Sequence, residues 1–207
     1  IKVKDYVKWG VENNMSALAI TDHGVANGLV EFYSECKAQG IKPILGCEFY
    51  EAPTDRTVKG NASDDRYHHL VLLVKNETGY RNLCRLVTRA NTEGFYYKPR
   101  VDKELLEKYH ENLICSSACL GGEIPQKILK GDIAGARESV QWYRNLFGED
   151  YYLEVQLHKS EMPGYSEDTY PKQLEVNKVI FSLAQELGVK VIATNDVHFT
   201  SKEDGPA

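Results

Sequence analysis

Short apolar runs alternate with longer amphipathic stretches along the whole chain. The apolar runs are rich in Val, Ile and Leu, which is typical of buried strands. In the longer stretches apolar residues recur every three or four positions, which indicates helices with one face turned to a core. We predict strands over residues 18–22, 43–50, 69–74, 113–117, 151–157 and 189–194. We predict helices over residues 2–14, 26–38, 78–92, 102–109, 123–148 and 170–187, with a break near Gly131 and with Thr78 as an N-cap.

The repeated order of strand and then helix determines the expected fold class. Parallel strands need a crossover connection, usually a helix, so this order predicts a parallel sheet with helices packed outside it. Because the unit recurs along the whole chain, we expect the sheet to close into a distorted α/β barrel rather than to stay open. Two polar stretches lie between the elements: residues 53–66, which read as an exposed loop, and residues 94–100, a loop rich in aromatic and basic residues.

Acidic residues and histidines lie at the ends of the apolar runs. Asp22 and His23 close the first run, Glu48 lies near the end of the second, and Asp196 and His198 follow the last. The carboxyl ends of barrel strands meet at one end of the fold, where such proteins gather their chemistry. A carboxylate at the end of an apolar strand is costly to bury without a partner. The pattern therefore predicts that these side chains converge on one metal site.

Two further residues extend this candidate cluster. Cys119 follows the fourth run and Glu154 lies within the fifth. A mixed set of imidazoles, carboxylates and one thiolate suits zinc, manganese or iron, and such ions can hold phosphate oxygens and activate water. The alternatives stay open: a buried cysteine often only packs, and a single histidine is often a cap or a core residue. On spacing alone His69 reads as a loop residue, whereas Arg100, in the aromatic and basic loop, could face a phosphate.

Composition narrows the class of protein. With 207 residues, 42% of them hydrophobic, the chain can bury a core as one domain. A net charge of −5 argues against a protein that binds nucleic acid over its whole surface, so any such contact must be local. The five cysteines form no Cys-x-x-Cys pair, which disfavours a disulfide framework and a zinc ribbon and makes a reducing cytoplasm the expected compartment. No apolar stretch reaches the length of a membrane span, so we expect no membrane partner.

Five stretches carry a resemblance to a known family. They are ALAITDHG at 17–24, GIKPILGCE at 40–48, HLVLLVKNETGYRNL at 69–83, GFYYKPR at 94–100 and ATNDVH at 193–198. In order and spacing the chain resembles the polymerase and histidinol phosphatase (PHP) family, and within it the N-terminal PHP domains of bacterial replicative DNA polymerases. The KNETGY stretch resembles the polymerase branch rather than the free-standing phosphatases. The resemblance implies that residues 1–207 form a single PHP domain of a longer polymerase chain.

This resemblance also implies a metal site. It implies a distorted seven-stranded barrel that holds up to three divalent ions, zinc first, with manganese or iron as alternatives. Transferred residue by residue, its metal ligands are His23, Glu48, His69, Cys119, Asp196 and His198. His69 thereby joins the cluster, against its interpretation as a loop residue. The candidate catalytic residues are Asp22, which would support His23 as a neighbouring carboxylate, together with Glu154 and Arg100.

One motif of the family has no counterpart in this sequence. The family's His-x-His pair on its first strand would precede Ile1. We therefore expect that the first strand of the barrel and two ligands are missing from this chain, and that metal binding by the chain alone is incomplete.

The resemblance implies a function in DNA replication. Polymerase activity, a nucleotidyl transfer, would reside in other domains, and this domain would act as a metal-dependent phosphoesterase or 3′–5′ exonuclease in proofreading. The implied partners are DNA, through the full-length polymerase, and other replicative subunits, among them the proofreading exonuclease and the sliding clamp. Two alternatives stay open: a small-molecule phosphatase resembling histidinol phosphatase, and a non-catalytic structural platform for a proofreading subunit.

Overall fold

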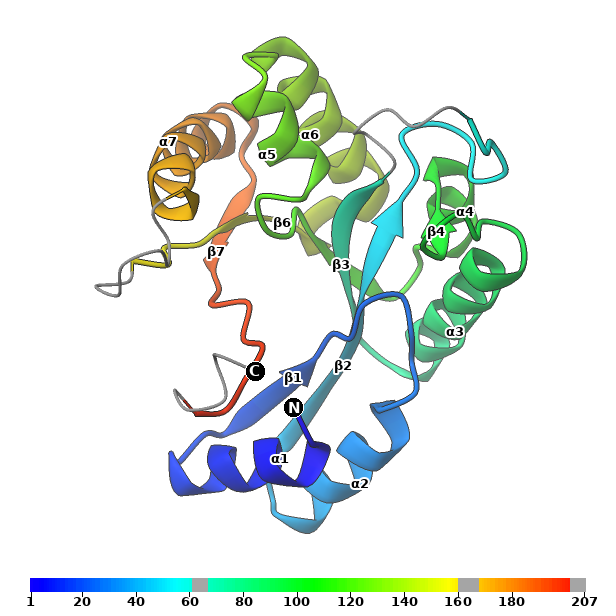
Figure 1. The fold of residues 1–207 in the computed structure, drawn as a ribbon, viewed down its shortest axis with the longest axis vertical. Coiled ribbons are helices and arrows are strands. Elements are labelled where there is room, and N and C mark those ends of the chain that lie inside the picture. Colours follow the sequence, from blue (N-terminus) through cyan, green and yellow to red (C-terminus); the bar gives the residue numbers. More distant parts are fainter. Residues whose placement is uncertain (61–66, 160–167, 202–207) are drawn as a thin grey trace.

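A strongly curved sheet with helices along its outer face makes up the fold in the computed structural model (Figure 1). The structure describes residues 1–60, 67–159 and 168–201. Its strands are β1 (Ala17–Ile20), β2 (Lys42–Glu51), β3 (His68–Val74), β4 (Arg100–Val101), β5 (Leu113–Ser116), β6 (Tyr151–Val155) and β7 (Lys190–Ala193). Its α-helices are α1 (Val3–Glu12), α2 (Leu29–Ala38), α3 (Glu77–Thr92), α4 (Lys103–Tyr109), α5 (Glu123–Leu129), α6 (Ile133–Phe147) and α7 (Thr169–Leu187).

The sheet curls toward a barrel. Its neighbours follow the order β1-β2-β3-β5-β6-β7, and β4 lies beside β2. Among the described residues β1 and β7 do not pair with each other, so the sheet is a half-barrel with two free edges (Figure 1). The expected α/β class with barrel-like curvature is confirmed. None of the described helices is long and apolar enough to cross a membrane.

One strand runs against the expected direction. β3 pairs antiparallel with β2, where Tyr50 lies opposite His69, and antiparallel with β5, where Val71 lies opposite Ser116. The prediction of an all-parallel sheet is therefore wrong. No helix is described between β2 and β3, and a chain that returns without a crossover pairs antiparallel. As a consequence, the first residues of β3 lie beside the last residues of its neighbours β2 and β5.

The predicted elements are present, with differences at their ends. The break near Gly131 is confirmed, since α5 and α6 meet there and Gly131 has a φ of +77°. The prediction of Thr78 as the N-cap of α3 is wrong: the cap is Asn76, whose side chain accepts a hydrogen bond from the Gly79 amide at 3.1 Å. The strand β4 was not predicted. Of the predicted loop at 53–66, residues 61–66 lie outside the described residues.

The main core lies between the sheet and its outer helices. Its fully buried members include Phe49 of β2, Leu72 of β3 and Leu86 of α3. Burying each such side chain contributes about 2 kcal/mol. A smaller cluster beneath α1 and α2 joins them to β1 through Val7, Leu18, Phe32, Cys36 and Ile41. The two clusters together hold the strands whose ends carry the candidate ligands.

A buried polar network crosses this core. The Tyr143 hydroxyl contacts a carboxylate oxygen of Glu51 and lies 2.9 Å from one of Glu123. One hydroxyl proton cannot serve both carboxylates, so one carboxyl group must carry a proton. Burial alone would raise the pKa of Glu123, but hydrogen bonding to Lys127 and the charge of Lys103 lower it to about 2. Glu51, fully buried and beside that negative charge, has its pKa raised to about 8 and therefore holds the proton.

We expect Gly79→Ala to destabilise the fold by about 3 kcal/mol. A Cβ at this position would lie 2.1 Å from the carbonyl oxygen of Asn112, a backbone atom that cannot rotate away. The helix α3 must therefore shift away from Asn112, the residue before β5. Urea unfolding of the variant beside Thr78→Ala, an exposed change in the same helical turn, measures the effect. Equal unfolding midpoints for the two variants would show that the close approach is not a constraint.

Candidate metal centre

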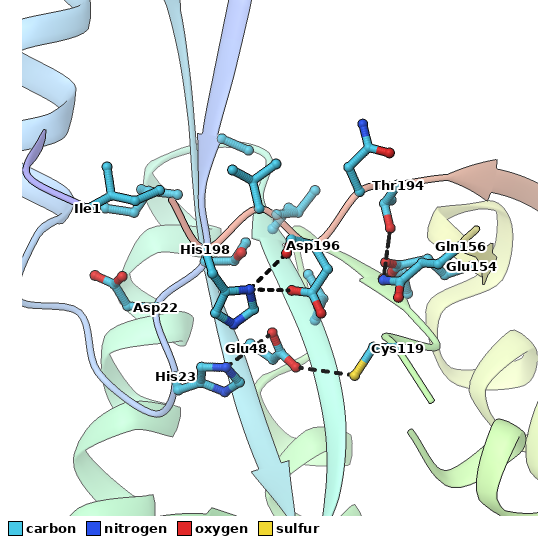
Figure 2. Close-up of a pocket in the computed structure, with 18 of the residues that line it drawn as sticks. Ile1, Asp22, His23, Glu48, Cys119, Glu154, Gln156, Thr194, Asp196 and His198 are labelled. Carbon is cyan, nitrogen blue, oxygen red and sulfur yellow. Dashed lines mark hydrogen bonds and ion pairs between the residues drawn. The ribbon is translucent and has the colours of Figure 1, made fainter. Parts of the chain in front are cut away.

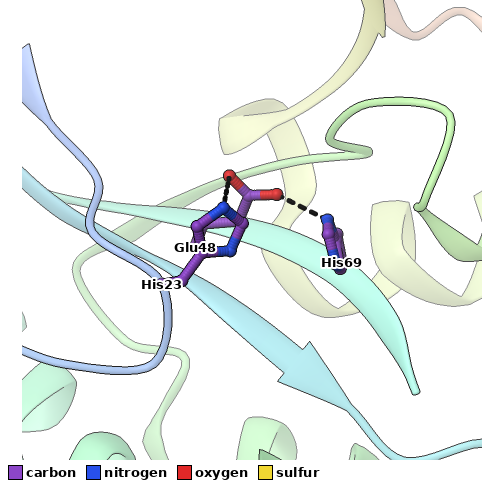
Figure 3. Close-up of side chains that lie close together, drawn as sticks. All are labelled: His23, Glu48 and His69. Carbon is purple, nitrogen blue, oxygen red and sulfur yellow. Dashed lines mark ion pairs between the residues drawn. The ribbon is translucent and has the colours of Figure 1, made fainter. Parts of the chain in front are cut away.

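His23 and Glu48 lie side by side because the pairing of β1 with β2 continues past the end of β1. The Glu48 amide donates to the Asp22 carbonyl at 3.1 Å, and the Gly24 amide donates to the Glu48 carbonyl at 2.9 Å. His23 and Glu48 thereby form an isolated parallel bridge. The His23 Nε2 atom lies 3.8 Å from Glu48 Oε2 (Figure 3). The Glu48 side chain is only 7% exposed, so its charge needs a partner.

His69 supplies a second imidazole from β3. Its Nδ1 atom lies 2.8 Å from Glu48 Oε1, on the opposite carboxylate oxygen from His23 (Figure 3). One ligand atom from each of His23, Glu48 and His69 lies within 4.8 Å of the other two. Two imidazoles and a carboxylate at this spacing fit a divalent ion such as zinc, manganese or iron.

Cys119 extends the group from the turn after β5. Its Sγ atom lies 3.5 Å from His69 Nδ1 and 4.0 Å from Glu48 Oε1. The turn is closed by the Gly122 amide, which donates to the Cys119 carbonyl at 3.0 Å. A Cβ on Gly121 would lie 3.0 Å from His69 Nδ1, so a glycine leaves room for that imidazole. The thiol is therefore positioned as a further donor to the same group.

Asp196 and His198 approach the group from the segment after β7. Asp196 adopts a left-handed conformation, with a φ of +47°. The ring nitrogen Nδ1 of His198 lies 2.8 Å from the Asp196 carbonyl oxygen and 3.8 Å from its Oδ1 (Figure 2). The His198 ring centre lies 6.2 Å from that of His23. The structure thus brings together both strand ends that the sequence singles out.

All of these candidate ligands except His69 line one pocket of about 480 Å³ between the two edges of the sheet. Figure 2 shows Asp22, His23, Glu48, Cys119, Glu154, Asp196 and His198 around it. Glu154 is buried and accepts hydrogen bonds from Ser116 at 2.5 Å, from Gln156 at 3.1 Å and from Thr194. Glu154 is therefore held by neighbouring hydroxyl and amide groups at the wall of the pocket rather than among the metal donors.

Arg100 lies elsewhere. It is 4% exposed, and its guanidinium donates to the backbone carbonyls of Gly94, Arg56 and Val58 at 2.7–3.1 Å. Because these donors are committed inside the protein, we do not retain Arg100 as a residue that faces a phosphate.

The electrostatics of the centre favour a cation. Burial alone would lower the pKa of His69, but hydrogen bonds to Cys119 and Glu48 and the charges of those groups raise it to about 10. The surrounding carboxylate and thiol thus stabilise positive charge at the position of this imidazole. A metal cation in its place would meet the same field.

Two tyrosines complete the surroundings and were not predicted. The Tyr50 ring stacks on His23 with centres 5.6 Å apart, and Tyr67 stacks on His69 at 6.0 Å. Tyr50 lies two residues after Glu48 on the same strand, and alternate residues share a face, so the spacing could have indicated it. Tyr67 precedes a strand, and nothing in its spacing marks it.

Sequence comparisons match the chain to one protein family and to DNA polymerase III alpha subunits. Residues 1–158 match the family described as PHP domain. The DNA polymerase III subunit alpha of Chlamydia pneumoniae is 45% identical over 217 residues, covering 99% of this chain and 17% of that protein. The same subunit of Borreliella burgdorferi is 43% identical over 209 residues, covering 100% of this chain and 17% of that protein. The chain thus spans about a sixth of the length of these curated relatives.

Solved structures share the fold at low identity. A putative metal-dependent phosphoesterase from Bifidobacterium adolescentis superposes with a TM-score of 0.51 at 13% identity, over 97% of this chain and 84% of that one. An amidohydrolase from Chromobacterium violaceum with bound sulfate superposes with a TM-score of 0.56 at 11% identity, over 99% of this chain and 84% of that one. At such identities the likeness concerns the fold.

Proposed function

Because the chain belongs to the PHP domain family, we propose that it is the PHP domain of a bacterial replicative DNA polymerase and hydrolyses phosphoester bonds with divalent metal ions. The observation that carries this proposal is the group of His23, Glu48 and His69, whose ligand atoms lie within 4.8 Å of one another. His23 and Glu48 also line the pocket. A buried carboxylate between two imidazoles needs positive charge beside it, and a bound divalent cation would supply that charge.

The candidate site residues have different proposed roles. His23, Glu48 and His69 would hold a first cation, and Cys119, Asp196 and His198 would supply donors for it and for further ions. A bound divalent ion, which we propose to be zinc, would supply Lewis-acid activation of a phosphoester and of water. Asp22, the residue before His23, lines the same pocket and is our candidate for a supporting carboxylate. Glu154, held by Ser116 and Thr194, lines the same pocket and is proposed to contact the substrate there.

The length and names of the relatives support a role in DNA replication. The relatives are DNA polymerase III alpha subunits, and the chain aligns with about a sixth of their length. We propose that the whole protein is such a subunit in the cytoplasm, that nucleotidyl transfer occurs in its other domains, and that its partners are DNA, a proofreading exonuclease and the sliding clamp. In this setting the phosphoester is the 3′-terminal diester of a DNA strand.

Metal analysis combined with two substrates tests the proposal. Full-length protein is stripped with chelator, reloaded separately with zinc, manganese or iron, and assayed on a 3′-labelled single-stranded oligonucleotide and on histidinol phosphate. We expect bound metal, release of the 3′ nucleotide only in loaded protein, and no turnover of histidinol phosphate. Turnover of histidinol phosphate alone would assign a small-molecule phosphatase, and bound metal with no hydrolysis of either substrate would assign a structural platform.

A further inference from the structure

The aromatic and basic loop at residues 94–100 supplies no candidate metal ligand, and it exposes side chains that are suited to binding a ligand. We propose that this loop is a base-stacking site for single-stranded DNA at the rim of the centre. The direction of the strand toward the metal rests on the proposed function, whereas the binding itself does not.

The loop exposes two large aromatic side chains. Phe95 is 53% exposed and Tyr97 is 62% exposed, and Lys98 between them and the core is also exposed. Exposed rings next to a cation are the usual elements of sites that bind single strands, because every base has a face that stacks and every nucleotide carries a phosphate. The acidic balance of the whole chain makes such a contact local.

The backbone holds these rings at some cost. Tyr97 has a φ of +59°, a left-handed conformation that bulky residues avoid. The turn around it is closed by the Tyr96 amide, which donates to the Lys98 carbonyl at 3.0 Å. A glycine or asparagine at this tip would relieve the conformation. An exposed tyrosine held in such a conformation by a hydrogen-bonded turn is the kind of outlier that points to a binding role.

Hydrogen bonds from Arg100 tie the base of the loop to the core. The Arg100 guanidinium donates to the carbonyls of Gly94, Arg56 and Val58 and lies 5.1 Å from the centre of the Tyr96 ring. A Cβ on Gly94 would lie 2.0 Å from the Arg100 carbonyl oxygen. A preformed surface loses little conformational entropy when a strand binds.

The loop touches the metal centre through two contacts. A Cβ on Gly24, the residue after His23, would lie 2.7 Å from Cγ of Pro99, so the loop packs directly on the His23 turn. The Lys98 ammonium lies 5.4 Å from the centre of the Tyr50 ring, and that ring stacks on His23. Only the Tyr50 ring therefore separates a phosphate bound at Lys98 from His23, a candidate metal ligand.

Photocrosslinking in the full-length protein tests the site without relying on activity. The probe is an oligodeoxythymidylate with 5-iododeoxyuridine next to its 3′ end, incubated in chelator so that no hydrolysis occurs. Trypsin releases residues 90–100 as one peptide, and residues 179–190, which contain the equally exposed Phe181, as an internal control. We expect crosslinks on the peptide 90–100 and none on 179–190.

Variants at the tip of the loop give the affinity. Tyr97→Gly removes the ring and relieves the positive φ, and we expect the crosslinking titration to shift to roughly 5- to 100-fold higher oligonucleotide concentration. The unfolding temperature of the variant is measured in parallel, so that a loss of affinity can be told apart from a loss of fold. Tyr97→Trp should keep wild-type affinity. Wild-type affinity in Tyr97→Gly, or crosslinks confined to other peptides, would overturn the site and leave the metal chemistry untouched. Loss of hydrolysis with the crosslinks intact would instead count against the proposed function.

Discussion

Glu48→Gln is expected to empty the metal centre and to lower hydrolysis of a 3′-terminal phosphodiester by a hundredfold or more. The amide keeps the shape of the side chain but removes the charge that lies between His23 and His69. Metal affinity depends on ligand charge, and a divalent ion supplies both the activation of water and the charge that holds the phosphate. Loss of a group that merely orients a ligand already costs about 10- to 100-fold, so loss of a ligand costs at least as much.

The measurement is metal content by emission spectroscopy together with the rate of nucleotide release. Glu186→Gln, the same chemical change at an exposed ion pair with Arg137, is the control and should match the wild type. Unfolding temperatures of both variants in chelator exclude a loss of fold. Full metal content in Glu48→Gln would show that this carboxylate is not a ligand.

Glu51→Gln is expected to change how stability depends on pH. The pKa of Glu51 is raised from 4.5 to about 8, first by burial and then by the charge of Glu123. Between these two pH values the folded chain holds a proton that the unfolded chain has released, so this group's contribution to stability is complete below about pH 4.5 and is lost as the pH rises toward 8. The slope approaches about 1.4 kcal/mol per pH unit. A glutamine has no proton to lose, so the variant should lack this slope.

Urea unfolding of the wild type and Glu51→Gln at pH 5, 6.5 and 8 measures the difference. We expect the variant to gain stability relative to the wild type as the pH rises, because its amide can still pair with the Tyr143 hydroxyl at every pH. Tyr143→Phe should behave differently, since it removes the hydroxyl that separates the two carboxyl groups. A constant difference between Glu51→Gln and wild type across this range would show that Glu51 does not carry the proton.

The sequence predicted the elements well and the direction of one strand poorly. Runs of Val, Ile and Leu marked every strand of the main path, and acid–histidine pairs marked the two ends that meet at the pocket. Spacing assigned His69, the first residue of the run 69–74, to the loop that enters the strand, and in a parallel sheet such a residue lies at the opposite end of the strands from Glu48. Because β3 is antiparallel, its first residues lie opposite Tyr50, at the end of the strands that carries the candidate ligands.

Arg100 and β4 show a second limit. A basic residue among aromatics suggests an anion site, but the position of a guanidinium depends on which carbonyls the distant segment around Arg56 leaves free. That information comes from contacts between residues far apart in the chain. The resemblance to a family could single out His69 as a candidate ligand, since it carries such contacts implicitly, whereas local propensity could not.

Some of the candidate ligands lie on the segments that follow the two opposite edge strands of the half-barrel, β1 and β7. His23 belongs to the edge at β1, and Asp196 to the edge at β7, with most of the chain between them. An ion bound by both would act as a cross-link that fixes the curvature of the sheet, much as a disulfide closes a long loop. The metal would then have a structural role as well as a catalytic one, and the width of the pocket would depend on which ion is bound.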